Sequence, residues 1–188
     1  MDAIVFDLET TGLTPYVADI IQIGAVYSTA EEPVKATFSV NVMPQVLKVS
    51  RDLLTNSDHP WERTLNSKNM RDSVDTVTAR AMFESFILEH MGSLYKSVLV
   101  GHRVTTFDLR FLKGDTESDH VKWMTPNYLD TRSMATLLHH VGRGPKNTGS
   151  SFLFRHYNAE PPEELRHTAL GDAVATAHVF QAQLKELA

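Results

Sequence analysis

Two carboxylates stand at the end of an otherwise apolar segment, and this feature restricts the chain more than any other in its sequence. Residues 3–8 are mostly apolar and β-branched, which predicts a buried strand. Asp7 continues that strand and Glu9 follows two positions later, so both side chains leave the same face of the sheet. Burial of an ionised carboxylate is costly unless a cation or dense hydrogen bonding compensates. The segment therefore indicates a divalent-metal site, with a solvated strand end that binds nothing as the alternative.

The rest of the chain predicts three strands before any long helix, and then helices and strands in alternation. Apolar residues that recur every three or four positions indicate the helices, and short apolar or alternating segments indicate the strands. The expected strands are residues 3–8, 20–26, 37–42 and 98–100, with a brief extended piece near 128–129. The expected helices are residues 74–91, 107–112, 131–140, 152–157 and 169–187, the last with Thr168 as its N-cap. Residues 48–73 are polar and weakly patterned, and no element is assigned to them.

Length and composition predict a single soluble domain over residues 1–188, because 42% hydrophobic and 22% charged residues are ordinary proportions for a globular protein. The formal charge of −5 does not attract a polyanion, so any contact with nucleic acid must be local or assisted by a metal ion. The absence of cysteine excludes disulfides, thiolate zinc sites and cysteine nucleophiles. No transmembrane span or signal peptide is evident in the sequence, and we expect a cytoplasmic protein with no membrane partner.

Two later segments add acids and a histidine to the strand pair. Asp108 opens the helix expected after the strand at residues 98–100, and Asp172 lies about one turn inside the last helix. His167 precedes Asp172 by five positions. Taken singly, each acid is explained as a first-turn residue that interacts favourably with the helix dipole, and the histidine as a surface residue. Their joint occurrence with Asp7 and Glu9 favours a shared site.

These segments together resemble the DEDDh 3′→5′ exonucleases, also called DnaQ-like exonucleases, of the RNase H-like superfamily. The resemblance is strongest over residues 6–13, Phe-Asp-Leu-Glu-Thr-Thr-Gly-Leu, and residues 19–26, Asp-Ile-Ile-Gln-Ile-Gly-Ala-Val. Residues 102–112 are similar to the second family motif, and residues 167–173 to the third. The five-residue interval from His167 to Asp172 resembles the histidine subclass. The similarity covers nearly the whole chain.

The resemblance implies an α/β fold of the RNase H-like type, with a mixed five-stranded sheet flanked by helices. It also implies two bound Mg²⁺ ions, which oxygen-rich sites favour and for which Mn²⁺ would substitute. By carry-over, Asp7 bridges both ions, Glu9 and Asp172 complete the site of one, and Asp108 supports the other. His167 is the expected general base, because an imidazole with an ordinary pKa of about 6.5 accepts a proton from the attacking water.

The resemblance further implies contacts to the terminal nucleotide from Thr10, Thr11 and Leu13, which would otherwise form only a turn. His102 is expected to position the substrate, but here the sequence departs from the family.

Family members commonly have His-Asn before Phe-Asp, with the histidine five positions ahead of the aspartate. In this chain His102 is six positions ahead of Asp108, and Arg103 stands in the place of the asparagine. If a bulge or loop absorbs the extra residue, Asp108 keeps its register.

The expected activity is hydrolysis of phosphodiester bonds from the 3′ end of single-stranded nucleic acid, DNA favoured, with release of nucleoside monophosphates. A replication or repair protein is a candidate partner. Three alternatives stay open: an RNA-trimming enzyme of the same family, a non-catalytic nucleic-acid-binding module on the same fold, and a metal-dependent hydrolase of nucleotides.

Overall fold

The computed structural model describes residues 1–43, 48, 72–113 and 127–188 of the chain. Its strands are β1 (Ala3–Thr10), β2 (Ile20–Ser28), β3 (Ala36–Asn41), β4 (Leu99–Gly101) and β5 (Tyr128–Asp130). Its helices are α4 (Thr76–Met91), α5 (Asp108–Leu112), α7 (Thr131–His140), α8 (Ser150–His156) and α9 (Ala169–Leu187), with the 3₁₀ helix η1 (Glu163–Leu165) before α9. Most of the segment 48–73, which the sequence left unassigned, lies outside the described residues.

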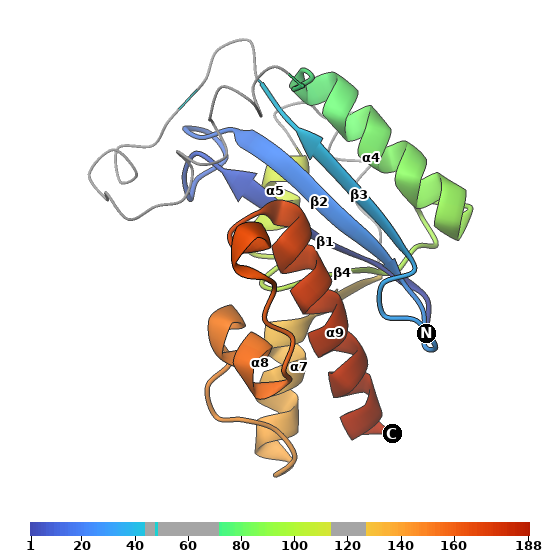
Figure 1. Cartoon of the computed structure of the whole chain (residues 1–188), viewed down its shortest axis with the longest axis vertical. Coiled ribbons are helices and arrows are strands. Elements are labelled where there is room, and N and C mark those ends of the chain that lie inside the picture. Colours follow the sequence, from blue (N-terminus) through green and yellow to red (C-terminus); the bar gives the residue numbers. More distant parts are fainter. Residues whose placement is uncertain (44–47, 49–71, 114–126) are drawn as a thin grey trace.

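The five strands form one mixed sheet in the order β3-β2-β1-β4-β5. The pairs β3–β2 and β2–β1 are antiparallel, whereas β1–β4 and β4–β5 are parallel. The fold class expected from the sequence, an α/β protein with a mixed five-stranded sheet flanked by helices, is thereby confirmed (Figure 1). The alternation at residues 37–42 is also explained, because β3 is an edge strand with one exposed face.

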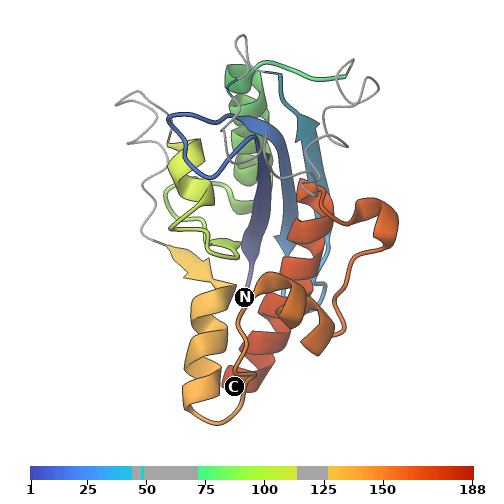
Figure 2. The same ribbon diagram turned by 90° about the vertical axis from the view of Figure 1, so that its left-hand side faces the viewer.

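Helices cover both faces of the sheet, and the two-residue period of β1 decides which side chains meet which helix. Helix α4 packs on one face and α9 on the other, and Figure 2 shows the two helices on opposite sides of the strands. On the α4 face, Ile4, Phe6 and Leu8 pack in the larger apolar core. On the α9 face, Ala3 and Val5 pack with small and aromatic residues of α9 in a second core. Asp7 and Glu9 continue this second series of positions, so β1 directs both carboxylates towards the face that α9 covers.

Local sequence explains where the helices begin and end. Asp75 precedes α4 and its carboxylate accepts hydrogen bonds from the backbone N–H groups of Val77 and Thr78, both within 3.0 Å. Gly92 ends the same helix in the left-handed conformation, at φ 70°. Thr168 caps α9 as expected, since its hydroxyl oxygen accepts from the Gly171 N–H at 3.0 Å. Of the helices in the described ranges, none is long and apolar enough to cross a bilayer.

Candidate active site

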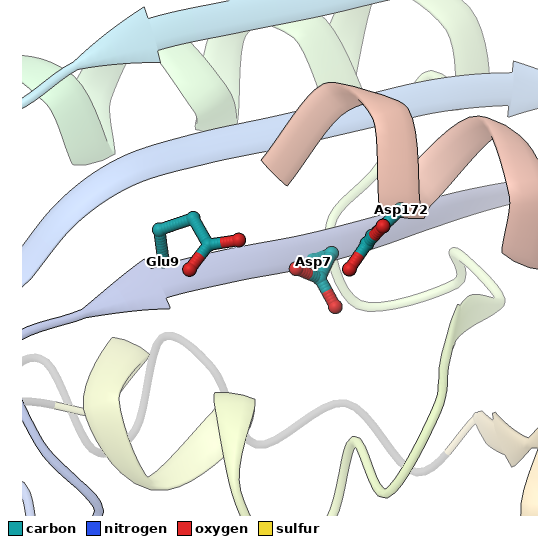
Figure 3. Close-up of side chains that lie close together, drawn as sticks. All are labelled: Asp7, Glu9 and Asp172. Atoms are coloured by element: carbon teal, nitrogen blue, oxygen red, sulfur yellow. The ribbon is translucent and has the colours of Figure 1, made fainter. Parts of the chain in front are cut away.

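The structure brings Asp7 and Glu9 of β1 together with Asp172 of α9. One carboxylate oxygen from each of the three residues lies within 4.8 Å of the others. Figure 3 shows the three side chains directed towards one another from the strand and the helix. Residues that are 163 positions apart in sequence, from Glu9 to Asp172, therefore form one acidic cluster.

Asp108 lies beside this cluster but is not one of its three members. The Asp108 side chain is 2% exposed, and its carboxylate accepts a hydrogen bond from the backbone N–H of Leu8. Strand β1 runs past the last residue of β4, so the Leu8 N–H has no partner strand on that side, and Asp108 satisfies it. This contact holds Asp108 between the positions of Asp7 and Glu9 along β1.

A tight turn at Arg103 precedes α5. Arg103 has φ 64°, and its carbonyl accepts hydrogen bonds from the N–H groups of Thr106 and Phe107, each at 3.0 Å. A left-handed residue at this point turns the chain sharply, and α5 then begins at Asp108. That Asp108 keeps the register of the family motif stays a prediction.

Burial makes all four carboxylates difficult to ionise, and repulsion from the other acids adds to this effect for Asp7 and Glu9. Burial raises the pKa of Asp7 well above its usual value, and repulsion from Asp108, Asp172 and Glu9 adds to this effect. Burial also raises the pKa of Glu9 to about 8, with Asp172 and Asp108 contributing. A group that resists ionisation in this way is typical of a site that binds charge.

The other two carboxylates are perturbed in the same direction but less strongly. Burial raises the pKa of Asp108 to about 7, although hydrogen bonds from its own backbone N–H and that of Leu8 oppose the shift. Burial raises the pKa of Asp172 to about 6, against the effects of the Arg166 charge and of a hydrogen bond from the His167 backbone. Both opposing contacts stabilise the ionised form.

The donor set fits a hard divalent cation. Three carboxylates from two elements offer oxygen ligands in a small volume, and their shared negative charge makes a cation the natural compensation. They also border a pocket of about 370 Å³, whose described lining includes Asp7, Glu9, Leu13, His167 and Asp172. A polar ligand in that pocket would therefore contact the acidic cluster.

His167 connects this pocket to a second one. It stands directly before the Thr168 cap, is exposed, and has φ 58°, a conformation that is uncommon for a residue with a side chain. It lines the pocket beside Asp7 and also a neighbouring pocket of about 300 Å³, which Asp172 shares. His167 thus borders both the pocket beside Asp7 and the neighbouring one.

The residues expected to contact substrate have different surroundings. Leu13 is 65% exposed and Thr10 is buried, and both line the pocket beside Asp7. Thr11 is fully buried, its N–H donates to the Asp19 carbonyl at 2.9 Å, and its hydroxyl oxygen accepts from the Asp19 N–H at 2.9 Å. Thr11 therefore closes the turn between β1 and β2, which is the alternative role that the sequence left open.

His102 makes its side-chain hydrogen bond to Thr131 of α7. The Thr131 hydroxyl donates to the Gly101 carbonyl at 3.3 Å, so its oxygen accepts from His102 Nδ1 at 3.1 Å. Burial lowers the pKa of His102 to about 4, which keeps the imidazole neutral. The described residues that line the pocket of about 370 Å³ do not include His102. A role of His102 in positioning substrate stays a prediction.

Sequence reasoning missed three residues that shape the site. Phe107 lines the pocket beside Asp7, and Gln22 and Gly24 lie on β2 where α9 begins. The sequence does mark two of these residues as unusual, because Gln22 is a polar residue inside an apolar strand and Gly24 is a glycine in a strand interior. Both patterns indicate that another part of the chain approaches the strand closely.

Comparison with known proteins relates this geometry to a family. The family model RNase_T, described as "Exonuclease", matches residues 4–180. A DNA polymerase III of PolC type from Thermotoga maritima is 30% identical over an alignment of 190 positions, which covers 94% of this chain and 11% of that protein. A DNA polymerase III subunit epsilon-like protein from Rhodobacter capsulatus is 32% identical over 178 residues, covering 94% of this chain and 23% of the relative. The chain thus spans less than a quarter of either relative.

A solved structure has the same fold. The nuclease domain of 3′hExo, described as a DEDDh family member bound to rAMP, has a TM-score of 0.68 and 17% sequence identity, over 98% of this chain and 92% of that one. The family match includes all three residues of the acidic cluster. The chain therefore belongs to the exonuclease family.

Proposed function

We propose that the protein is a Mg²⁺-dependent 3′→5′ exonuclease that removes nucleoside monophosphates from single-stranded nucleic acid, with DNA as the favoured substrate. The observation that carries the proposal is the convergence of Asp7, Glu9 and Asp172 within 4.8 Å in a pocket that His167 also lines. A carboxylate cluster with a histidine at its mouth suits metal-assisted hydrolysis.

The four carboxylates would hold two Mg²⁺ ions, with Mn²⁺ as a substitute. We propose that Asp7 would contact both ions, because the charges of Glu9, Asp108 and Asp172 all act on its carboxylate. Glu9 and Asp172 would serve one ion, and Asp108 the other. Bound divalent ions at such a site supply positive charge that stabilises the attacking and leaving oxygens of a phosphoryl transfer.

His167 is the proposed general base. It would accept a proton from the water that attacks the phosphorus, and the bond from phosphorus to the 3′ oxygen of the preceding nucleotide would break. The products would be one nucleoside 5′-monophosphate and a chain shortened by one residue, whose leaving 3′ oxygen takes a proton from solvent and becomes a 3′ hydroxyl. Exposure of His167 allows the accepted proton to pass to solvent.

The pocket supports a short contact with a strand end. Leu13 and Phe107 present apolar surface beside the acids, which suits a sugar or base of the terminal nucleotide. Thr10 borders the same pocket. His102, which directly follows β4, is proposed to position the substrate. The polymerase names of two relatives support DNA as substrate and a partner from DNA synthesis or repair.

A time course on matched 5′-labelled DNA and RNA oligonucleotides tests the proposal. With Mg²⁺ we expect a ladder that shortens from the 3′ end, faster for DNA, and no ladder with EDTA. The Asp7→Asn variant should give no ladder, whereas the exposed cap variant Asp75→Asn, prepared identically, should cleave like the parent protein. Loss of cleavage in Asp7→Asn alone would exclude a contaminating nuclease, because both variants are prepared in the same way.

The other outcomes decide between the alternatives. Faster cleavage of RNA would assign the protein to RNA trimming. Release of the labelled nucleotide at the start of the reaction would contradict the 3′→5′ direction. Folded protein without cleavage in Mg²⁺ or Mn²⁺ would favour a binding module, and turnover of nucleotides alone a nucleotide hydrolase.

A further inference from the structure

Gln22 joins the sheet to the first residue of α9. Its side-chain oxygen Oε1 accepts a hydrogen bond from the backbone N–H of Ala169 at 2.7 Å, and its Nε2 donates to Oδ1 of Asn41 at 2.9 Å. The Gln22 side chain is 8% exposed. The first N–H groups of a helix have no partner within the helix, so a buried acceptor at this point fixes where the helix starts.

The orientation of the Gln22 amide follows from its partners. A backbone N–H only donates, so the Gln22 group that faces Ala169 must be the oxygen. The amide nitrogen then faces Asn41, whose side chain presents its own oxygen. Asn41 thus keeps the Gln22 oxygen aimed at α9.

Strand register places this contact next to the acidic cluster. Gln22 of β2 is the direct partner of Glu9 in β1 and of Asn41 in β3. Directly paired residues of neighbouring strands share one face of the sheet, so Glu9, Gln22 and Asn41 form a row on the α9 side. Glu9 in this row belongs to the acidic cluster. Gln22, the next residue of the row, accepts a hydrogen bond from the first residue of the helix that carries Asp172.

We propose that Gln22 is a positioning residue for metal binding, which sets the approach of Asp172 to Asp7 and Glu9 by fixing the start of α9. The inference rests on the proposed function, because it assumes that these three carboxylates hold the metal ions. Gln22 is not a ligand in this proposal. It acts through the Ala169 N–H, and Asn41 acts through Gln22.

The test is a Mn²⁺ titration, followed by calorimetry or by the electron paramagnetic resonance of the ion, on the whole chain. Gln22→Met removes the acceptor with little change in length, and we expect a loss of Mn²⁺ affinity of about tenfold or more, as for other residues that orient metal ligands.

Gln181 provides the matched control. It is a buried glutamine of α9 whose Nε2 donates to Ser28 Oγ of β2 at 2.9 Å, and Ser28 pairs with Ala3 at the opposite end of β1. Gln181→Met also breaks a hydrogen bond between helix and sheet, so its Tm should fall. Its Mn²⁺ affinity should equal that of the parent protein.

The outcomes separate this inference from the proposed function. A Gln22→Met variant with lowered Tm but parental Mn²⁺ affinity would overturn the positioning role. If Gln22→Met does not fold, Asn41→Leu, which removes only the acceptor for the Gln22 amide, must weaken Mn²⁺ binding for the inference to stand. A parent protein that binds no Mn²⁺ would instead overturn the metal-dependent function itself, and the positioning role with it.

Discussion

The backbone of Ala169 lies directly against Gly24, so that a Cβ atom on residue 24 would come within 2.2 Å of the Ala169 carbonyl carbon. Gly24 is paired with Asp7 across β2 and β1. The lack of a side chain at this strand position lets α9 begin immediately above the sheet, next to Asp7. The distance between the two elements that carry the acidic cluster is therefore set by a glycine.

Replacement of Gly24 by alanine is expected to damage stability and activity together. The added methyl group would meet backbone atoms that cannot rotate away, at a cost of about 1–3 kcal/mol, or a fall in Tm of about 2–4 °C for each kcal/mol. Displacement of Asp172 by about 1 Å should lower activity about 100-fold. Thermal unfolding and the oligonucleotide assay measure both effects.

Gly149→Ala is the control for Gly24→Ala. The nearest atom to a Cβ added at residue 149 would be Asn147 Oδ1 at 3.4 Å, which is an ordinary van der Waals contact. This variant should keep the parental activity. Equal activity of Gly24→Ala and the parent protein would show that α9 tolerates displacement from the sheet.

Removal of the His167 imidazole should slow catalysis without loss of metal binding. A general base contributes about 10²–10⁴-fold to rate, so kcat of His167→Ala should fall by that order while its Mn²⁺ affinity stays unchanged. His178→Ala removes an exposed histidine from α9 and serves as the control. If His167→Ala loses metal affinity to the same extent as activity, His167 is a ligand instead of a base.

The Asp7→Asn variant should be inactive and yet more stable than the parent protein when metal is absent. Loss of charge stabilisation at the reacting phosphate, several kcal/mol, corresponds to at least about 10²–10³-fold in rate. Without metal, however, the neutral amide removes the cost of burying the Asp7 charge and its repulsion from the other carboxylates, so Tm in EDTA should rise. A lower Tm in EDTA would mean that the Asp7 charge is compensated by the protein itself.

Removal of metal should make stability depend on pH between about 6.5 and 8. The pKa of Glu9 is raised to about 8 and that of Asp108 to about 7, so each binds a proton more tightly in the folded than in the unfolded chain. The folded state then binds more protons than the unfolded state, and stability falls as pH rises through this window. Neutral His102, with its pKa lowered to about 4, changes stability only at lower pH.

Thermal unfolding in EDTA and in Mn²⁺ across this range measures the effect. We expect Tm to fall with pH in EDTA, and the fall to shrink in Mn²⁺, because the bound ion compensates the carboxylates. Asp7→Asn in EDTA should show a weaker dependence on pH than the parent protein. A Tm in EDTA that is constant or rises over the window would contradict the raised pKa values.

Local pattern was sufficient for the described strands and α-helices and for the two carboxylates of β1, but not for the 3₁₀ helix η1. A run of apolar residues with a period of two predicts a strand wherever it is packed, and the same period places Asp7 and Glu9 on one face. Helix α9 could also be predicted from the sequence, because its cap Thr168 and its apolar residues lie close together along the chain. Such features depend on residues only a few positions apart.

Contacts between distant residues decided the rest of the site. The sequence shows a glutamine and a glycine in β2, but only the packing of α9 on the sheet reveals that Gln22 binds the Ala169 N–H and that Gly24 admits the Ala169 backbone. Likewise, Asp108 contacts the Leu8 N–H because β4 ends before β1 does, which is a property of strand order and register. The sequence by itself determined which residue types were available and the face from which each strand presents them. The tertiary structure decided which of them meet, because that depends on the order of strands and on how closely a helix can approach them.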